Sequence, residues 1–389
     1  MNPRHIFSTC LILACFSIHA ENDSSKITEA LQPFVDSHTL AGAVTLVANK
    51  EKVLAIDTVG YSDVAAGVPM KADCLFWIAS MSKPMTATAL MMLVDEGKVN
   101  VDDPVEKYLP EFKGQMLLAE QDKDHVTLKK PSRAILVRDV LSHTSGMPFM
   151  SRVEHKIDSW SLKEAAVSYA LTPLNTEPGA KYAYSNAGIN IAGRIIEVVS
   201  GMPYEDFMDK RLLKPLGMKD TTFWPSESKL KHLAKSYKPN TAKDGFEEID
   251  VGQLTYPLTD RKRGPSPAGG YFSTAKDVGI FGRMLLNGGE LDGKRYISEA
   301  SLKVMTSKQT GALENGYGFG FSVDKGSGAF GHGGAYATDL WVDPAKGLVY
   351  VYMVQAAGYP NKDGGKINPT FRKTATELFG PKDPAPKVP

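Results

Sequence analysis

Cysteine is scarce in this chain, and its scarcity excludes folds that depend on disulfides. Only three cysteines occur in 389 residues, and Cys10 and Cys15 lie within an apolar N-terminal stretch that has the character of a leader. Cys74 would then have no partner for an internal disulfide, and we interpret it as a buried structural thiol. No Cys-x-x-Cys or His-x-x-x-His spacing occurs. We therefore expect no metal site and no other cofactor.

An excess of charge of either sign is also absent. Lysine and arginine total 45, against 44 aspartate and glutamate residues. So balanced a chain has no electrostatic reason to bind nucleic acid or an anionic membrane. We expect a small and roughly neutral ligand and no nucleic-acid partner, while the oligomeric state has no signal in the sequence.

Apolar runs long enough for a permanent membrane-spanning helix are missing as well. The run at residues 7–18 follows the positive charge of Arg4 and leads to a small residue, Ala20. This pattern is typical of a secretory signal peptide cut near Ala20, and a run this short does not span a bilayer. Cys15 offers the alternative of a lipoprotein processing site. The sequence thus predicts a secreted or periplasmic protein with residues 1–20 as its signal peptide.

What is present is a clear division between β-rich ends and a helical middle. Two β-rich runs flank a polar turn and predict a hairpin, and further strand patterns appear only near the other end of the chain. The strands are predicted at residues 43–48, 53–59, 316–323, 329–332, 339–342 and 348–355. Helices are predicted at residues 80–96, 187–200 and 369–379, with a mostly helical pattern over 102–262.

This order of elements predicts an α+β fold. The simplest arrangement is an α/β sandwich whose central antiparallel sheet is built from both chain ends, flanked by the first and last helices. Residues 21–98 and 263–380 would form this α/β domain, and 99–262 a mostly helical inserted domain. The tail at 381–389 is rich in proline and lysine, and we expect it to be disordered.

The segment Ser80-Met81-Ser82-Lys83 is the first candidate for chemistry. Ser-x-x-Lys occurs five times in the chain, so the spacing alone is a weak signal. Ser80 differs because it opens a well-patterned helix, which places Ser80 and Lys83 on one face. The field at a helix N-terminus favours an ionised serine and a neutral lysine, and a desolvated lysine can act as a base. A structural serine at a helix start is the competing interpretation.

Tyr184-Ser185-Asn186 is the second candidate, because it stands immediately before the helix at 187–200. A phenol hydrogen-bonded to a lysine can pass a proton between nucleophile and leaving group. Asn186 can hold a substrate carbonyl or fix Lys83. Taken alone, the motif is explained equally well as a loop tyrosine followed by a helix-capping asparagine.

The third candidate is Gly331-His332-Gly333-Gly334-Ala335, at the edge of a predicted strand. Its glycines would let a substrate backbone approach and pair with the strand. The amide of Ala335 could join that of Ser80 as an oxyanion hole. A Gly-rich turn with an exposed histidine is the competing interpretation.

Together these three motifs resemble, in kind and order, the active-site set of the penicillin-recognising serine hydrolases. The chain is most similar to the branch that contains class C β-lactamases, D-alanyl-D-alanine peptidases and family VIII carboxylesterases. The resemblance covers about residues 27–380, and it includes the stretches 95–104, 141–146, 215–218 and 268–274.

The resemblance implies a role for each candidate residue. Ser80 would be the nucleophile that forms an acyl-enzyme, Lys83 its conjugate base and Tyr184 the proton shuttle. The backbone amides of Ser80 and Ala335 would form the oxyanion hole. The substrate contacts would be Asn186, His332, Gly333 and Gly334. His143 matches a family position that we interpret as structural.

Departures from the family pattern indicate which substrate to expect. No Lys-Ser/Thr-Gly occurs, and His332 stands where a lysine is usual in class C β-lactamases. With an ordinary pKa of about 6.5, a histidine is mostly neutral at pH 7, and Gly333 removes a hydroxyl that could bind a carboxylate. Both changes favour small neutral esters or amides. The order of expectation is an esterase-like hydrolase, then a D-alanyl-D-alanine carboxypeptidase or D-aminopeptidase, then a β-lactamase.

Two other classes of protein are disfavoured. An α/β-hydrolase would need Gly-x-Ser-x-Gly, which is absent. A catalytically silent sensor of cell-wall fragments should have lost one of Ser80, Lys83 or Tyr184, and all three are present.

Overall fold

The computed structural model describes residues 15–382. Residues 1–14 of the predicted signal peptide and 383–389 of the predicted tail therefore lie outside the described residues. Within the described range, no helix combines the length and the apolar character needed to cross a membrane.

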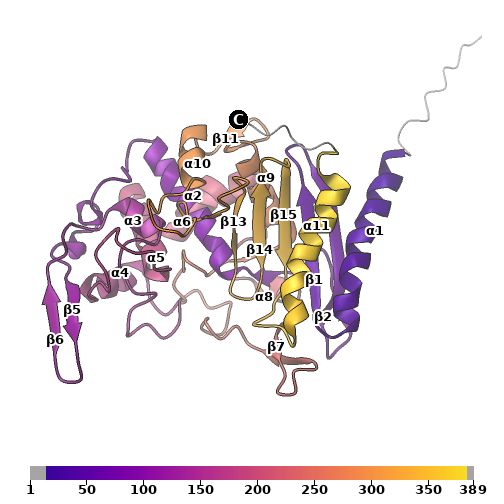
Figure 1. The fold of residues 1–389 in the computed structure, drawn as a ribbon, viewed down its shortest axis with the longest axis horizontal. Helices are drawn as coiled ribbons and strands as arrows, with labels where there is room; N and C mark the ends of the chain where they lie inside the picture. Colours follow the sequence, from indigo (N-terminus) through magenta and orange to yellow (C-terminus); the bar gives the residue numbers. More distant parts are fainter. Residues whose placement is uncertain (1–14, 383–389) are drawn as a thin grey trace, which may run out of the picture.

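A seven-stranded antiparallel sheet forms the centre of the fold, with strand order β12-β13-β14-β15-β1-β2-β3 (Figure 1). Its strands are β1 (Gly42–Ala48), β2 (Val53–Asp63), β3 (Val68–Pro69), β12 (Ser322–Val323), β13 (Phe330–Gly333), β14 (Asp339–Asp343) and β15 (Leu348–Met353). Strand β1 pairs with β15, and Leu46 lies opposite Val351. This pairing confirms the predicted antiparallel sheet built from both ends of the chain.

Helices cover both faces of the sheet. They are α1 (Cys15–Asp36), α2 (Ser82–Asp95), α9 (Ala275–Leu286) and α11 (Ile367–Phe379). Helices α1 and α11 lie together on one face (Figure 1), where Leu31, Val47 and Phe371 share an apolar cluster. Helix α9 covers the other face, where Leu46 and Phe281 belong to the main core. Successive side chains of a strand point to opposite faces of the sheet. Because helices cover both faces, β1 is buried along its whole length.

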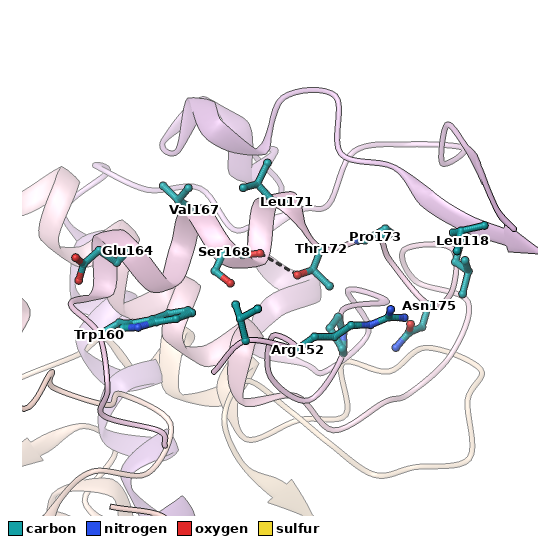
Figure 2. Close-up of a pocket in the computed structure, with 13 residues that line it drawn as sticks. Leu118, Arg152, Trp160, Glu164, Val167, Ser168, Leu171, Thr172, Pro173 and Asn175 are labelled. Carbon is teal, nitrogen blue, oxygen red and sulfur yellow. Dashed lines mark hydrogen bonds between the residues drawn. The ribbon is translucent and has the colours of Figure 1, made fainter. Parts of the chain in front are cut away.

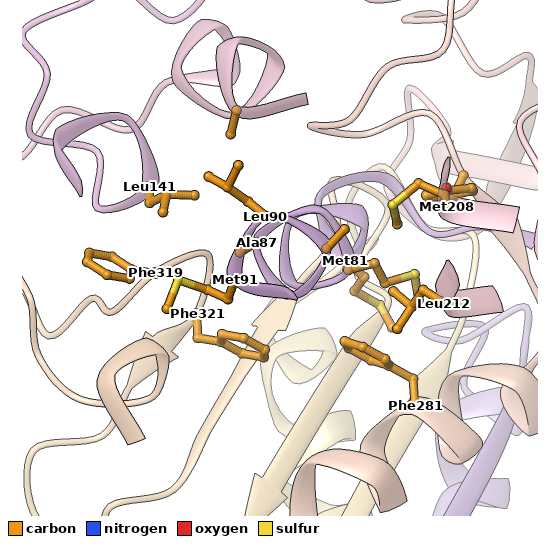
Figure 3. Close-up of a cluster of buried hydrophobic side chains, with 14 of the residues drawn as sticks. Met81, Ala87, Leu90, Met91, Leu141, Met208, Leu212, Phe281, Phe319 and Phe321 are labelled. Atoms are coloured by element: carbon orange, nitrogen blue, oxygen red, sulfur yellow. The ribbon is translucent and has the colours of Figure 1, made fainter. Parts of the chain in front are cut away.

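Helix α2 is the buried support on which the candidate site rests. Its residues from Ser82 to Leu93 are all buried. Apolar side chains from the helical region and from the sheet side surround it (Figure 3), among them Leu141, Leu212, Phe281 and Phe321. Each large apolar side chain buried in this way contributes about 1.5–3 kcal/mol. The turn that precedes α2 is therefore anchored to a rigid element.

The stretch between the two β-rich ends contains more β structure than the sequence predicts. Its helices are α3 (Val137–Leu141), α4 (Leu162–Leu171), α5 (Asn186–Ser200), α6 (Tyr204–Met208), α7 (Lys214–Leu216) and α8 (Glu227–Leu230). Two hairpins were not predicted: β5 (Leu117–Gln121) with β6 (Val126–Lys129), and β7 (Ser236–Pro239) with β8 (Phe246–Ile249). They escape notice because their charged side chains give the low strand propensity of a loop, and all of β6 is exposed.

The strand predicted at 316–323 is wrong except at its end, because only Ser322–Val323 is a strand. Gly320 has φ 76°, and a side chain there would lie 2.6 Å from the Cβ of Ala87. The glycines instead let an irregular turn pass close against α2, and this turn carries Tyr317. The strands predicted at the three following positions are confirmed as β13, β14 and β15, and the predicted helices as α2, α5 and α11, all within about two residues at each end.

The remaining elements are short. They are β4 (Phe76–Trp77), β9 (Phe272–Ser273), β10 (Glu290–Leu291), β11 (Lys294–Arg295) and α10 (Glu299–Met305), together with several 3-10 turns and one π-helical segment, Asp209–Leu213.

Candidate active site

Ser80 lies in a 3-10 turn, Ala79–Met81, between strand β4 and helix α2. Ala79 has φ 45°, in the left-handed region that residues with a Cβ seldom adopt. Such a conformation costs about 1–3 kcal/mol and persists only where its surroundings hold it. Here the Ser82 hydroxyl donates a hydrogen bond of 2.7 Å to the Ala79 carbonyl. The strained turn leaves Ser80 half-buried at the start of α2.

The Lys83 amine makes three polar contacts. Its Nζ lies 2.9 Å from Ser80 Oγ, 2.7 Å from Asn186 Oδ1 and 2.7 Å from the carbonyl oxygen of Ala268. The side chain is fully buried, and no carboxylate among residues 15–382 forms an ion pair with it. Burial therefore holds the pKa of Lys83 well below its usual value.

A neutral Lys83 has only one arrangement that satisfies all three contacts. A neutral amine carries two N–H groups and one lone pair. The oxygens of Asn186 and Ala268 can only accept, so they take both N–H groups. The lone pair then faces the hydroxyl of Ser80, which is the geometry of a general base beside its nucleophile.

Tyr184 packs against the Lys83 amine, whose Nζ lies 4.7 Å from the centre of the phenol ring. Burial raises the pKa of Tyr184 well above its ordinary value, and a hydrogen bond with Ser80 offsets part of that rise. The phenol is therefore protonated at neutral pH and contacts the candidate nucleophile. The ring of His143, at 4.4 Å between ring centres, holds it in place.

Asn186 is the first residue of α5, and its position is fixed by the helix start. The hydroxyl of Ser185 caps this helix by accepting the N–H of Gly188 at 3.2 Å. Asn186 accepts from Lys83 through Oδ1, while its Nδ2 has no hydrogen-bond partner among residues 15–382. One residue can thus fix the lysine and still present a donor to a substrate.

The Gly331–Ala335 segment brings the end of β13 against the Ser80 turn. A side chain at Gly334 would lie 2.6 Å from the carbonyl oxygen of Ile78, so only glycine allows this approach. Ala335, the next residue, is exposed, and its N–H has no partner in the described part of the chain. Gly333 is also exposed, at the point where β12 has stopped pairing with β13.

The His332 side chain is buried, with 6 % of its surface exposed, and both of its ring nitrogens are engaged. Nδ1 lies 2.6 Å from the carbonyl oxygen of Gly333, and Nε2 lies 2.9 Å from the hydroxyl of Tyr317. Burial lowers the pKa of His332 to about 3, so the ring is neutral at pH 7. The ring therefore has no free nitrogen to offer a substrate.

Tyr317 joins two buried histidines in a chain of hydrogen bonds with one possible direction. The Gly333 carbonyl can only accept, so His332 donates through Nδ1–H and accepts the Tyr317 hydroxyl proton at Nε2. Tyr317 then accepts from His143 Nε2–H at 3.1 Å. His143 Nδ1 in turn accepts the backbone N–H of Ser185 at 3.2 Å. Burial holds the pKa of His143 well below its usual value, as this direction requires.

Replacing Tyr317 by phenylalanine tests whether this chain holds the Tyr184 and β13 segments together. The change leaves a donor on His143 and an acceptor on His332 buried without partners, and we expect a loss of about 2–4 kcal/mol in the free energy of unfolding. The kcat for an ester should fall while KM changes little, because the histidines shift but the substrate edge remains. Urea unfolding and steady-state kinetics measure the two effects.

The matched control for this prediction is Tyr182→Phe. The Tyr182 ring lies 5.7 Å from that of Tyr317, but its hydroxyl has no hydrogen-bond partner among residues 15–382. It should leave stability within about 0.5 kcal/mol of the parent. Equal losses in Tyr317→Phe and Tyr182→Phe would contradict the hydrogen-bonded chain.

Two members of the site were not predicted from the sequence. Ala268 contributes only a carbonyl oxygen, which has no residue-type signal, although its segment 268–274 belongs to the family resemblance. Tyr317 lies in a segment predicted to be a strand, so its contacts with His143 and His332 were not predicted. Its one signal was the series of glycines at alternate positions from Gly316 to Gly320, which is unusual within a strand.

Cys74 is buried, as predicted, and burial raises the pKa of its thiol. It is therefore a poor nucleophile at neutral pH. Among residues 15–382, no three side chains of the His, Cys, Asp and Glu types gather as ligands for a metal ion.

Fold and motif order together define a hydrolase of the serine β-lactamase superfamily. The chain belongs to the Beta-lactamase family, whose family model matches residues 27–369. Protein Rv1367c of Mycobacterium tuberculosis is 32% identical over 388 residues, which cover 89% of this chain and 94% of that protein. Esterase EstB of Burkholderia gladioli is 27% identical, covering 88% and 93%. These findings confirm the predicted family.

Among solved structures, EstCE1, a hydrolase with promiscuous acyltransferase activity, has the same fold. Its TM-score is 0.77 at 23% identity, and the match covers 92% of this chain and 99% of that chain. The likeness confirms the predicted α+β architecture.

Proposed function

We propose that this protein is a serine hydrolase that forms an acyl-enzyme on Ser80 and hydrolyses small neutral carboxylic esters or amides. One observation carries the proposal: the Lys83 amine is fully buried, with Nζ 2.9 Å from Ser80 Oγ and 2.7 Å from each of two carbonyl oxygens. In the neutral form that burial favours, its lone pair faces Ser80. A serine at a helix start with a merely structural role has no use for a desolvated base at that position.

In the proposed acylation step, Ser80 Oγ attacks the substrate carbonyl carbon while Lys83 takes its proton. The oxyanion forms between the amides of Ser80 and Ala335, and an N–H that is not already engaged is the donor such a site needs. The bond to the leaving group, the oxygen of an ester or the nitrogen of an amide, then breaks. Tyr184 donates its phenolic proton to that leaving atom, and the proton held on Lys83 restores the phenol.

Deacylation in this proposal repeats the same proton transfers with water as the attacking group. Water adds to the acyl carbon, and its proton returns to Ser80 Oγ through Tyr184 and Lys83. The carboxylic acid leaves, and the resting enzyme is restored with a neutral lysine and a neutral phenol. Atoms and charges balance without a metal or cofactor.

Charge around the substrate edge supports neutral substrates. His332 is held neutral by burial, its pKa lowered to about 3, so it supplies no cation for a substrate carboxylate at pH 7. Gly333 contributes no hydroxyl, and the pKa of Lys83 is also lowered. Esterase EstB, a relative that covers nearly the whole chain, is named for the same type of reaction.

A second candidate activity is cleavage of a D-alanyl-D-alanine peptide, and one observation favours it. Strand β12 pairs with Phe330 and Gly331 but not beyond, so the outer edge of β13 is open at Gly333. An extended peptide could add to such an edge as a further strand. A putative D-alanyl-D-alanine carboxypeptidase of Salmonella agona is 28% identical over 331 residues. Export by a signal peptide, predicted from the first twenty residues, suits both candidates.

A comparison of three substrates on the purified protein tests the choice. We expect kcat/KM for a short-chain p-nitrophenyl ester, corrected for the rate of a Ser80→Ala variant, to exceed by at least about 100-fold the values for a chromogenic cephalosporin and a D-alanyl-D-alanine peptide. Such a ratio corresponds to about 2.7 kcal/mol of transition-state preference. Dominant peptide cleavage would instead favour the second candidate, and dominant cephalosporin cleavage would contradict both.

A further inference from the structure

Exposed apolar side chains gather in a groove that is separate from the site around Ser80. The groove has a volume of about 630 Å³ (Figure 2), and no residue of the proposed catalytic set lines it. Among residues 26–382, four of the eleven exposed large apolar side chains line it: Val126, Val153, Val167 and Leu171. Leu171 is 80% exposed and Val153 58%. Single exposed apolar residues are ordinary, but a contiguous set around a hollow indicates a binding surface.

Helix α4 forms one wall of the groove (Figure 2), and it carries apolar residues on two of its faces. Residues spaced three or four apart along a helix share one face. The inward face carries Leu162, Ala165, Ala166 and Tyr169, which are buried in the core. The groove face carries Glu164, Val167, Ser168 and Leu171. The apolar side chains of the groove face, Val167 and Leu171, are not buried in the core, so their surface is available to a ligand.

The β5–β6 hairpin forms a second wall. Leu118 lies directly opposite Leu128 in the hairpin, so both side chains point to the same face. Val126, two residues before Leu128, points the same way because side chains alternate along a strand. Leu118 and Val126 line the groove. Thr127, which follows Val126 and points to the other face of the hairpin, does not.

Two charged residues line the groove, and only one of them is free to meet a ligand. Glu164 accepts the backbone N–H and the hydroxyl of Ser161 at the start of α4, so its carboxylate is already engaged. Arg152 is exposed, and among residues 15–382 it forms no ion pair or hydrogen bond. The groove thus combines a long apolar lining with one cation that has no partner, while the carboxylate of Glu164 stays ionised and is held by Ser161.

The groove shares a wall with the proposed active site. Pro148 lines the groove, and its carbonyl accepts the Ser185 hydroxyl at 2.7 Å, next to Tyr184 and Asn186. Phe149, the next residue, accepts the N–H of Asn186 at 2.9 Å. A ligand in the groove would therefore lie behind the segment that carries the Tyr184 motif, without reaching Ser80.

We propose that this groove binds a free fatty acid, with its hydrocarbon chain along α4 and the β5–β6 hairpin and its carboxylate at Arg152. The volume lies within the range of about 300–1,000 Å³ that is usual for small-molecule sites. Arg152 is the one charged group of the lining without a partner, and it complements a single anionic head group on one hydrocarbon chain. A membrane surface would instead call for several basic residues around a projecting apolar face, and here Arg152 is the one cation in the lining.

Equilibrium binding of laurate to the Ser80→Ala variant tests the proposal, because binding is then measured without turnover. We expect saturable binding of one laurate per chain below its micelle concentration, and removal of two carbons from the chain should weaken it about 15-fold. Leu171→Glu should weaken laurate binding at least tenfold, and since Leu171 is 80% exposed the fold should be unaffected. Val304→Glu, which changes an exposed apolar residue outside the groove, is the matched control.

A second variant separates the head group from the chain. Arg152→Gln should weaken laurate binding about three- to fivefold, as loss of an exposed charge pair does, and leave dodecanol binding unchanged. Equal effects on laurate and dodecanol, or unchanged laurate binding in Leu171→Glu, would overturn the proposal. So would a dimer that Leu171→Glu dissociates in the absence of ligand, or binding to phosphatidylcholine vesicles but not to free laurate. If the parent protein did not hydrolyse esters, this result would contradict the proposed function but not the proposed fatty-acid site.

Discussion

Replacing Ser80 by alanine is expected to lower kcat/KM for ester hydrolysis by about 10⁴-fold or more, while the fold remains intact. The change removes the one oxygen that would carry the acyl group. Ser80 is half-buried in its turn, and the hydrogen bond that holds this turn comes from Ser82, so stability should change little. Steady-state kinetics measures the rate. Mass spectrometry of the protein after treatment with a fluorophosphonate locates the covalent label.

The chain supplies its own control for this experiment. Ser226 also belongs to a Ser-x-x-Lys motif and also stands at a helix start, where it caps α8. Ser226→Ala should keep the parental rate and the parental label on Ser80. A Ser80→Ala protein that kept more than about 1% of the parental rate, or a label on another residue, would refute Ser80 as nucleophile.

Replacing Lys83 by methionine is expected to lower kcat/KM by about 10³-fold or more, because Ser80 is left as a neutral alcohol without a base. Methionine is apolar and unbranched, so it suits a side-chain site that is fully buried. Lys83→Arg should be equally inactive, since a guanidinium stays charged and offers no lone pair. The pair of variants thus separates the loss of a base from the loss of a charge.

The pH dependence of the parent protein follows from the same assignment. Burial lowers the pKa of Lys83, so its neutral form persists to lower pH than for an ordinary lysine. Below that lowered pKa the amine is protonated and has no lone pair for Ser80, so kcat/KM should rise with pH and then reach a plateau.

Lys229→Met is the control for the lysine variants, because Lys229 completes the Ser226 motif at the surface. It should leave both the rate and the pH profile unchanged. Parental activity in Lys83→Arg would refute a lone-pair role for this residue, and more than about 10% activity in Lys83→Met would refute the base itself.

The parts of the site that could be predicted from the sequence are those fixed by local structure. Ser80 and Lys83 are brought together by one turn of helix, and Tyr184 and Asn186 flank a helix start. Their patterns are local, so sequence alone locates them. The hydrogen bonds from Lys83 to Asn186 and Ala268 join segments far apart in the chain. No spacing rule predicts such contacts.

The role of His332 shows where reasoning from residue type alone falls short. The sequence predicted a substrate contact with an ordinary pKa, and an exposed histidine in a Gly-rich turn was the competing interpretation. Its environment is decided instead by Tyr317 and by the neighbouring Gly333 carbonyl, which engage both ring nitrogens. The glycine-rich turn that carries Tyr317 was itself predicted as a strand, so the partner of His332 could not be foreseen.

The pairing of β1 with β15 has a consequence for the order of events during synthesis. Val44 lies opposite Met353 in this pair, so the central sheet closes only after residue 353 has emerged. Contacts between such distant segments form slowly, because a long loop must close before any of them is gained. A nascent chain that ends before β15 already contains Ser80 and Lys83, but it lacks the sheet that supports the Gly334 contact with their turn. The proposed active site is therefore completed only once β15 has been made, and chains that end before it should be inactive.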